Sequence, residues 1–256
     1  MKTWATDVPT GVPRALEDLG FHGADLPPVR RAVRAHQGLV LVVGPRRSGL
    51  STTLAALHSV PPACIDAAGS VKPADLLLDP PPSPAATRRA IAAIPAGRRV
   101  FSSLALERAP HVFGHFRAMG LSPARLARDL LIVVAQQLVA RLCPACRLPD
   151  NSAELRQALA QATNSWLDGT PVAACVARAG GCAQCGGSGY AGHLLVYECL
   201  VVDSAVRAMA ELGAIGLAME QALFAHGSSL WDHGLRSIAQ GLCSLASLRC
   251  GVREPV

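Results

Sequence analysis

Residues 38–52 constrain the fold more than any other part of the chain, because an apolar run there leads into a glycine-containing loop and a helix-forming segment. Residues 38–43 are continuously apolar, which is typical of a buried parallel strand. The loop that follows matches the phosphate-loop template G-x-x-x-x-G-K-[ST] at its two glycines and its hydroxyl position, and backbone amides hold a phosphate in that template. The candidate nucleotide-binding residues are therefore Gly44, Pro45, Arg46, Arg47, Ser48, Gly49, Leu50, Ser51 and Thr52.

Leu50 stands where the template has lysine. The lysine would reach the β- and γ-phosphates as a point charge, and leucine carries no charge. Losing one such electrostatic donor removes several kcal/mol of transition-state stabilisation. The loop amides, Ser51 and the following helix N-terminus would still form an anion site, to which Arg46 and Arg47 could add charge. The alternative is an empty loop whose arginines are solvated.

The composition points to a cytoplasmic protein. Half of the 256 residues are apolar, and mean hydropathy is +0.30, but no window reaches the ~18 uncharged apolar residues of a membrane span. Residues 1–8 lack the apolar core of a signal peptide. We therefore expect a protein without a membrane-spanning segment.

The net charge of +6 comes from arginine, since Lys2 and Lys72 are the only lysines. The arginines are scattered along the chain, and aromatic residues make up only 4% of it, so there is no aromatic interleaving. This pattern argues against nucleic acid as a partner.

Strand and helix patterns alternate along the chain, which predicts an α/β domain with a mainly parallel sheet flanked by helices. The last helix of this region is expected to start after an N-cap Ser122 with Pro123 at its first position. Expected strands are 38–43, 63–66, 75–79 and 99–104, and expected helices are 13–19, 26–35, 51–59, 85–94, 109–119 and 123–142. Four segments follow: a lead-in (1–36), a phosphate-loop core (37–142), a cysteine module (143–199) and a helical C-terminal region (200–256).

Two Cys-x-x-Cys pairs dominate the cysteine module. Each pair places two sulfurs on one tight turn, so that together they can complete a tetrahedral zinc site, and glycines after the second pair let backbone amides turn toward the sulfurs. The predicted metal ligands are Cys143, Cys146, Cys182 and Cys185. The alternatives are four thiols that are merely buried, or a redox pair. The remaining cysteines lack this spacing and are expected to be ordinary buried thiols: Cys64, Cys175, Cys199, Cys243 and Cys250.

Several segments together resemble the C-terminal motor domain of the type II secretion and type IV pilus assembly ATPases. They read LEDLGF, HQGLVLVVGP, AQQLVARLCPAC, GCAQCGGSGY and VYE, followed by SLWDHGL and GLCSL near the C-terminus. The resemblance implies a P-loop NTPase (RecA-like) fold, a helix over residues 135–146 that leads into a four-cysteine zinc module, and partners in a secretion or pilus motor. The expected partners are a motor ATPase and the inner-membrane platform protein, with a peripheral place at the inner membrane.

The chain departs from the family pattern at its catalytic positions. Pro81 stands in the place of the Walker B glutamate, and Ala105 stands in the place of the histidine-box histidine. The family's general-base glutamate has no clear match near Cys64–Asp66, and no segment matches the N-terminal domain that supplies arginine fingers. The resemblance therefore implies no catalytic residue: a pseudo-ATPase with structural zinc and a structural or regulatory role.

Two other readings stay open. A weak ATP-binding subunit could be completed by neighbouring subunits in a hexamer, in which case ATP and Mg²⁺ would be its cofactors. A decaying paralogue with no retained role is the third reading, and the intact cysteine pairs argue against it.

Overall fold

The computed structural model describes residues 16–17, 20–21, 25–60, 75–78, 83–160, 172–216, 218–221 and 229–254. The chain divides into two compact units, one formed by residues 1–136 and 199–227 and the other by residues 137–198 and 228–256. Strands β4 (Leu130–Leu142) and β7 (Tyr190–Val201) each contribute residues to both units. Among the described helices, none has the length and apolar character needed to span a membrane. The four segments expected from the sequence remain a prediction.

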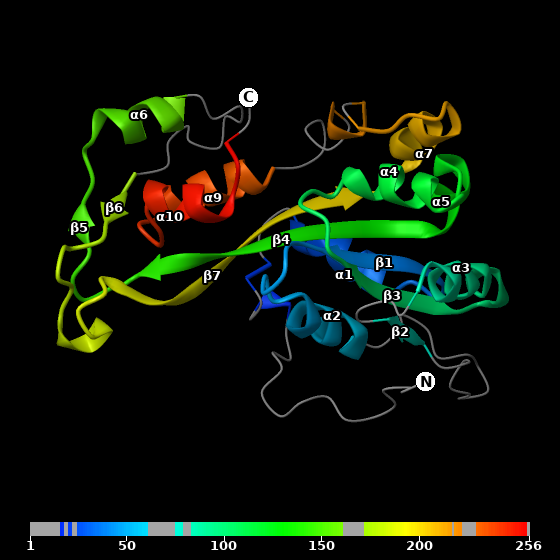
Figure 1. Cartoon of the computed structure of the whole chain (residues 1–256), viewed down its shortest axis with the longest axis horizontal. Helices are drawn as coiled ribbons and strands as arrows, with labels where there is room; N and C mark the ends of the chain where they lie inside the picture. The colour runs from blue at the N-terminus through cyan, green and yellow to red at the C-terminus, as the bar shows by residue number, and fades with distance from the viewer. Residues whose placement is uncertain are drawn as a thin grey trace. The chain divides into compact units, whose positions relative to one another are not determined.

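A five-stranded sheet runs in the order β2-β3-β1-β4-β7 (Figure 1). Strand β1 lies parallel to β3 on one side and to β4 on the other, and β2 lies parallel to β3. Every residue of β1 and β3 is buried, as the continuous apolar run of β1 predicts. The mainly parallel α/β sheet expected from the sequence is confirmed. The bounds are β1 Gly38–Val43, β2 Leu76–Leu78 and β3 Arg99–Leu104.

Helices surround this sheet in the first unit. Helix α2 packs against β1 and β3, and α5 packs against α4 and α7. The Nε of Arg207 in α7 donates to the carbonyl of Ala127 in α5 at 3.2 Å. These positions confirm most of the expected helices, while the expected elements at 13–19 and 63–66 fall largely or wholly outside the described residues. The bounds are α1 Leu26–Val33, α2 Leu50–Ser59, α3 Pro84–Ala92, η3 Ile94–Ala96, α4 His111–Ala118, α5 Pro123–Asp129 and α7 Ser204–Glu211.

The predicted helix over 123–142 is wrong beyond its first two turns. Ser122 does cap α5, since its side chain accepts from the Arg125 amide at 3.3 Å, but the helix ends at Asp129. Strand β4 then runs from Leu130 to Leu142, so the helix expected over 135–146 is wrong as well. The run Leu-Leu-Ile-Val-Val at 130–134 favours a strand. Pairing with β1 stabilises the strand over the expected helix.

Strand β7 runs antiparallel to β4. The Val202 amide donates to the Leu131 carbonyl at 3.0 Å at one end of the pair, and the Cys143 amide donates to the Gly189 carbonyl at 2.9 Å at the other. Since low residue numbers on one strand meet high numbers on the other, the two chain directions are opposed. The sheet is therefore parallel except at its β7 edge.

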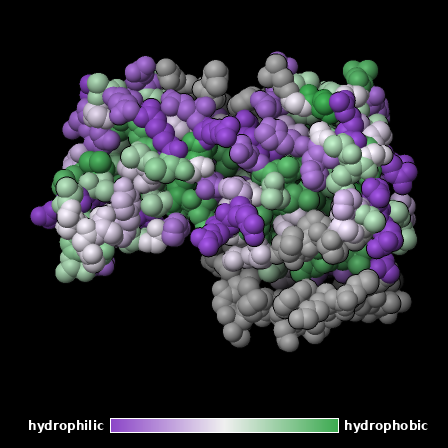
Figure 2. Space-filling view, viewed as in Figure 1, coloured by the Kyte–Doolittle hydropathy of each residue, from purple (hydrophilic) through white to green (hydrophobic). Residues whose placement is uncertain are grey.

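The second unit contains a two-stranded antiparallel ladder in which Leu148 pairs with Val176. Both side chains are well exposed, and hydrophobic atoms lie at the surface over this ladder (Figure 2). Helices α9 and α10 approach closely at Gly234, where a Cβ would lie only 2.2 Å from a methyl of Leu248. The bounds are β5 Leu148–Pro149, β6 Cys175–Val176, α6 Ala153–Ala160, η5 Ala183–Cys185, α9 Leu230–Ala239 and α10 Leu245–Gly251.

The N-terminus of α9 is satisfied by buried polar side chains. Ser229 and Asp232 form a capping box, in which the Ser229 side chain accepts from the Asp232 amide. Glu198 on β7 accepts from the Leu230 amide at 3.1 Å. A carboxylate at a helix N-terminus is favoured by the helix dipole, so a buried glutamate has a structural role here.

Candidate functional site

The candidate phosphate loop joins the C-terminal end of β1 to the N-terminus of α2. Gly49 is the N-cap of α2 with a left-handed φ of 83°, and no side chain caps the helix. The Ser48 amide donates to the Pro45 carbonyl at 3.2 Å, and the Thr53 amide donates to the Gly49 carbonyl at 3.1 Å. The first amides of α2 therefore have no side-chain acceptor, and such amides together with the helix dipole favour an anion.

Gly44 is the position at which the loop tolerates no side chain. A Cβ there would lie 2.4 Å from the Gln136 carbonyl oxygen, 2.5 Å from the Ser48 hydroxyl and 3.2 Å from Leu50 Cδ2. The Leu50 side chain therefore lies close to Gly44. An apolar, half-buried side chain stands at the position of the template's lysine.

The charges of the loop lie on its outer side. Arg46 and Arg47 are exposed, and so are Ser51 and Thr52. Arg47 is the one non-glycine residue in the described part of the chain that has a positive φ, 67°. Residues held in this region usually carry strain that the surrounding structure must offset.

Gln136 is a loop-contacting residue that the sequence analysis did not single out. Its side chain is fully buried on β4, and its Nε2 donates to the Ser48 carbonyl at 2.7 Å. Its polarity after an apolar run, and its place in the segment AQQLVARLCPAC, were the signals that could have drawn attention to it.

The position expected for the histidine lies beside the loop. The Gly44 amide donates to the Leu104 carbonyl at 3.2 Å, and Ala105 follows directly at the end of β3. Ala105 is exposed and offers only a methyl group. The other expected departures, at Pro81 and near Cys64–Asp66, lie outside the described residues.

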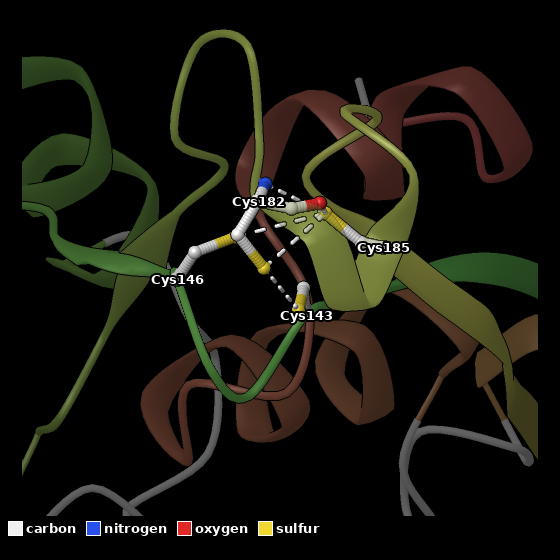
Figure 3. A group of neighbouring side chains, drawn as sticks. All are labelled: Cys143, Cys146, Cys182 and Cys185. Atoms are coloured by element: carbon white, nitrogen blue, oxygen red, sulfur yellow. Dashed lines mark hydrogen bonds between the residues drawn. The ribbon is translucent and has the colours of Figure 1, made fainter.

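The four cysteines of the two Cys-x-x-Cys pairs lie together in the second unit (Figure 3). Cys143 and Cys146 follow β4, whereas Cys182 is the N-cap and Cys185 the last residue of the short helix η5. All four sulfurs lie within 4.8 Å of one another. Three of the sulfur–sulfur distances are 3.9 Å (143–182), 3.8 Å (146–185) and 3.8 Å (182–185).

These distances fit a tetrahedral metal ion. With a Zn–S bond of about 2.3 Å, the edge of a tetrahedron of sulfurs is about 3.8 Å. The amides of Cys182 and Gly189 each donate to the Cys185 sulfur at 3.2 Å, as the glycines after this pair predict. Gly181 is needed for the turn, since a Cβ there would lie 2.5 Å from the Gly187 carbonyl carbon and 2.7 Å from the Cys185 sulfur.

The sulfurs differ in their readiness to ionise. The amide of Cys182, together with that of Gly189, lowers the pKa of Cys185 to about 6. Burial raises the pKa of Cys146 to about 12, and hydrogen bonding to Cys182 adds to this effect. A metal ion binds thiolates, so a zinc ion here would displace the Cys146 proton.

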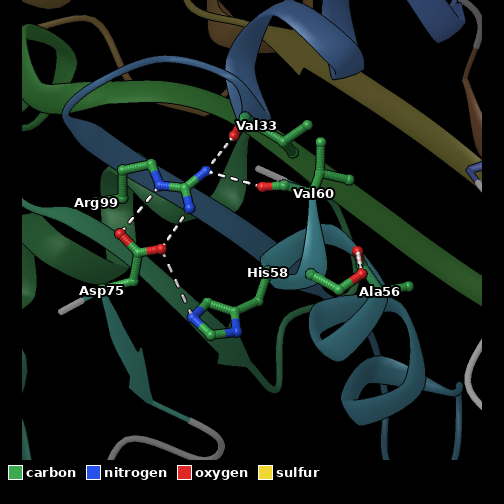
Figure 4. A network of polar contacts seen from close by, with 7 residues as sticks. Val33, Ala56, His58, Val60, Asp75 and Arg99 are labelled. Carbon is green, nitrogen blue, oxygen red and sulfur yellow. Dashed lines mark hydrogen bonds and ion pairs between the residues drawn. The ribbon is translucent and has the colours of Figure 1, made fainter. Parts of the chain in front are cut away.

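A second polar cluster belongs to the first unit and gathers around Arg99 and Asp75 (Figure 4). The buried Arg99, first residue of β3, donates through Nε to Asp75 Oδ1 at 3.0 Å and through a second nitrogen to Asp75 Oδ2. It also donates to the carbonyl of Val33, the last residue of α1, at 2.6 Å and to that of Val60, which follows α2, at 3.1 Å. Because the loop follows the other end of a parallel strand, this cluster is structural rather than part of the phosphate site.

Known proteins match most of the chain. The family model described as type II/IV secretion system protein matches residues 85–249. The type II secretion system protein E of Aeromonas hydrophila is 30% identical over 273 aligned residues, which cover 93% of this chain and 53% of that protein. The type IV pilus assembly ATPase PilB of Thermus thermophilus is 29% identical over 153 residues, covering 58% of this chain and 16% of that protein.

A solved structure supports the fold. The Legionella pneumophila ATPase DotB superposes with a TM-score of 0.60 at 13% identity, covering 93% of this chain and 65% of that one. The chain spans about half the length of the type II secretion relative and less of the pilus ATPase. The family match covers well over half of the chain, and the two Cys-x-x-Cys pairs lie inside it. The chain belongs to the type II/IV secretion system protein family.

Proposed function

We propose that this chain is a catalytically degenerate member of its family, a pseudo-ATPase with a structural or regulatory role in a type II secretion or type IV pilus motor. The observation that carries the proposal is Leu50, an apolar residue at the lysine position whose Cδ2 lies 3.2 Å from the position of a Cβ on Gly44. Phosphoryl transfer depends on positioning and charge stabilisation. A loop with an apolar side chain there, and with Ala105 beside it, lacks two of the groups that supply them.

Equilibrium binding and turnover of labelled ATP with Mg²⁺ test the proposal directly. We expect turnover no greater than that of a protein-free blank, for the unaltered chain and for Leu50→Met, a matched apolar control. Leu50→Lys restores the point charge and is expected to tighten ATP binding. Micromolar affinity with measurable turnover in the unaltered chain would overturn the proposal.

The second candidate is a weak ATP-binding subunit that neighbouring subunits complete in a hexamer. The uncapped N-terminus of α2 favours it, because its amides still suit a phosphate. In that case turnover would depend on protein concentration and would rise when the chain is mixed with a motor ATPase of the same system. ATP and Mg²⁺ would then be its cofactors.

The four cysteines support a structural zinc ion as part of the same proposal. Their sulfur separations suit Zn²⁺, and backbone amides already face the Cys185 sulfur. The ion would hold the turn after β4 against the turn around η5. A motor ATPase and an inner-membrane platform protein are the proposed partners, and the proposed location is the cytoplasm, peripheral to the inner membrane through those partners.

A further inference from the structure

Gln136 occupies a position on β4 that sheet packing alone does not explain. The residues that precede it on the strand, 130–135, are apolar, and Gln136 itself is 0% exposed. Burying a carboxamide among such residues is unfavourable unless it forms hydrogen bonds. The one it donates goes to the phosphate loop, from Nε2 to the Ser48 carbonyl at 2.7 Å.

Main-chain packing at the same place reinforces this contact. The Gln136 carbonyl oxygen lies 2.4 Å from the position that a Cβ on Gly44 would occupy. Gln136 therefore approaches the loop at two places. Its carbonyl oxygen lies near Gly44, and its side chain donates to Ser48. Ser48 is followed by Gly49, the N-cap of α2, so the hydrogen bond sits directly beside the uncapped helix amides.

We infer that Gln136 is a positioning residue for the phosphate loop: its carboxamide donates to the Ser48 carbonyl and so fixes the direction in which the loop amides point. Only the nucleotide-binding part of the test rests on the proposed function of the loop. The inference concerns loop geometry first, and it applies to an empty loop and to an occupied one alike.

The neighbouring residue provides a matched control. Successive side chains of a strand point to opposite faces. The Gln137 side chain lies against α10, with its Cγ 3.1 Å and its Nε2 3.3 Å from the position of a Cβ on Gly251. The same substitution at 136 and at 137 therefore perturbs two different surroundings from one strand.

Amide hydrogen exchange of the full chain tests the role without any ligand. Gln136→Met keeps the length of the side chain and removes the donor, so the peptide covering 44–52 is expected to exchange about tenfold faster, equivalent to one lost buried hydrogen bond. Gln137→Met should leave that peptide unchanged, and the peptide covering β1 should be unchanged in both variants. An unchanged loop in Gln136→Met, or an equal acceleration in β1, would overturn the assignment.

Gln136→Glu adds a readout that simple loss of packing would not produce. A protonated carboxyl can donate to the Ser48 carbonyl, whereas a carboxylate faces it with like charge. Corrected for intrinsic exchange, the loop of this variant should resemble the unaltered chain at low pH and Gln136→Met at high pH, across about pH 5 to pH 8. A loop that exchanges alike across this range would contradict the donor role.

Labelled ATP with Mg²⁺ then separates this inference from the proposed function. We expect Leu50→Lys to bind ATP, and Leu50→Lys combined with Gln136→Met to bind it about tenfold more weakly. Should Leu50→Lys fail to bind ATP, the expectation that a lysine restores nucleotide binding to the loop fails. The exchange result still decides the role of Gln136. Equal affinity of the single and double variants would contradict a positioning role in binding.

Discussion

Arg99 and Asp75 form a two-point ion pair at the amino-terminal edge of the parallel sheet, where Arg99 begins β3 and Asp75 directly precedes β2. The remaining guanidinium nitrogen of Arg99 serves the carbonyls of Val33 and Val60. One side chain thus joins the ends of α1 and α2 to two strands. This contact lies at the amino-terminal ends of the parallel strands, away from the candidate phosphate site.

Arg99→Met is expected to lower the free energy of unfolding by about 2–4 kcal/mol, because it leaves the Asp75 carboxylate and two carbonyls without their partner. Urea denaturation measures the change. Arg98→Met is the matched control, since that side chain is half-exposed, and its effect should stay within about 0.5 kcal/mol. Equal effects of the two substitutions would contradict the role of the ion pair.

His58 makes stability depend on pH. Burial lowers its pKa below the ordinary value of 6.5, and Arg99 adds to this, while Asp75 at 3.8 Å opposes it. Because the unfolded chain takes up the proton first, the contribution of His58 is complete above about pH 6.5 and is lost as pH falls toward its folded pKa. In His58→Gln the fall in unfolding free energy between about pH 7 and pH 5 should be smaller. An unchanged pH profile would contradict the prediction.

The sequence predicted the elements whose signals are local. Residues 38–43 and 99–104 carry their own β-forming pattern, and Ser122 carries its own cap. The strand at 130–142 was missed, because its parallel partner β1 lies about ninety residues earlier and no glycine or proline marks the end of α5. The Ser122 cap correctly predicted where the helix begins, but pairing with β1 makes residues 130–142 a strand.

The same difference applies to the sites. The spacing of each Cys-x-x-Cys pair is recognisable in the sequence, so the four candidate metal ligands could be named from it. The roles of Gln136 and of the Asp75–Arg99 pair could not be named, because hydrogen bonds to residues far away in the sequence define them.

Gly44→Ala is expected to destabilise the chain by about 1–3 kcal/mol, because the new methyl meets the Gln136 carbonyl oxygen at 2.4 Å and this backbone atom must move. Gly114→Ala in α4 is the opposite case: no atom lies within 4 Å of its Cβ position, so helix propensity should add about 0.5–1 kcal/mol. Thermal unfolding compares the two. A neutral Gly44→Ala would show that the loop has more room than these distances allow.

Arg47→Gly is expected to stabilise the empty loop by up to about 1 kcal/mol, since glycine adopts a φ of 67° without a Cβ clash. The exposed guanidinium has no acidic partner among the described residues, so its removal costs no ion pair. Urea denaturation of the two proteins measures this difference. A clear loss of stability would mean that the Arg47 side chain makes a contact that offsets the backbone strain.

Zinc affinity is expected to fall as pH is lowered, with one slope above about pH 6 and a steeper slope below it. In the metal-free chain Cys185, with a pKa of about 6, is already largely ionised at neutral pH, whereas Cys146, with a pKa of about 12, is protonated. Below about pH 6 the metal must displace one more proton, so log Kd plotted against pH should steepen by about one unit there. Competition with a chromophoric chelator measures the slope.

Cys185→Ser should abolish both the break in slope and stoichiometric zinc. Cys250→Ser should retain them, because this thiol lies outside the cluster and is exposed, contrary to the expectation that it is buried. Removing the metal from the unaltered chain should lower its melting temperature, because binding energy in such a site contributes to folding. A purified chain that contains no metal, and melts at the same temperature with and without added Zn²⁺, would contradict the zinc assignment.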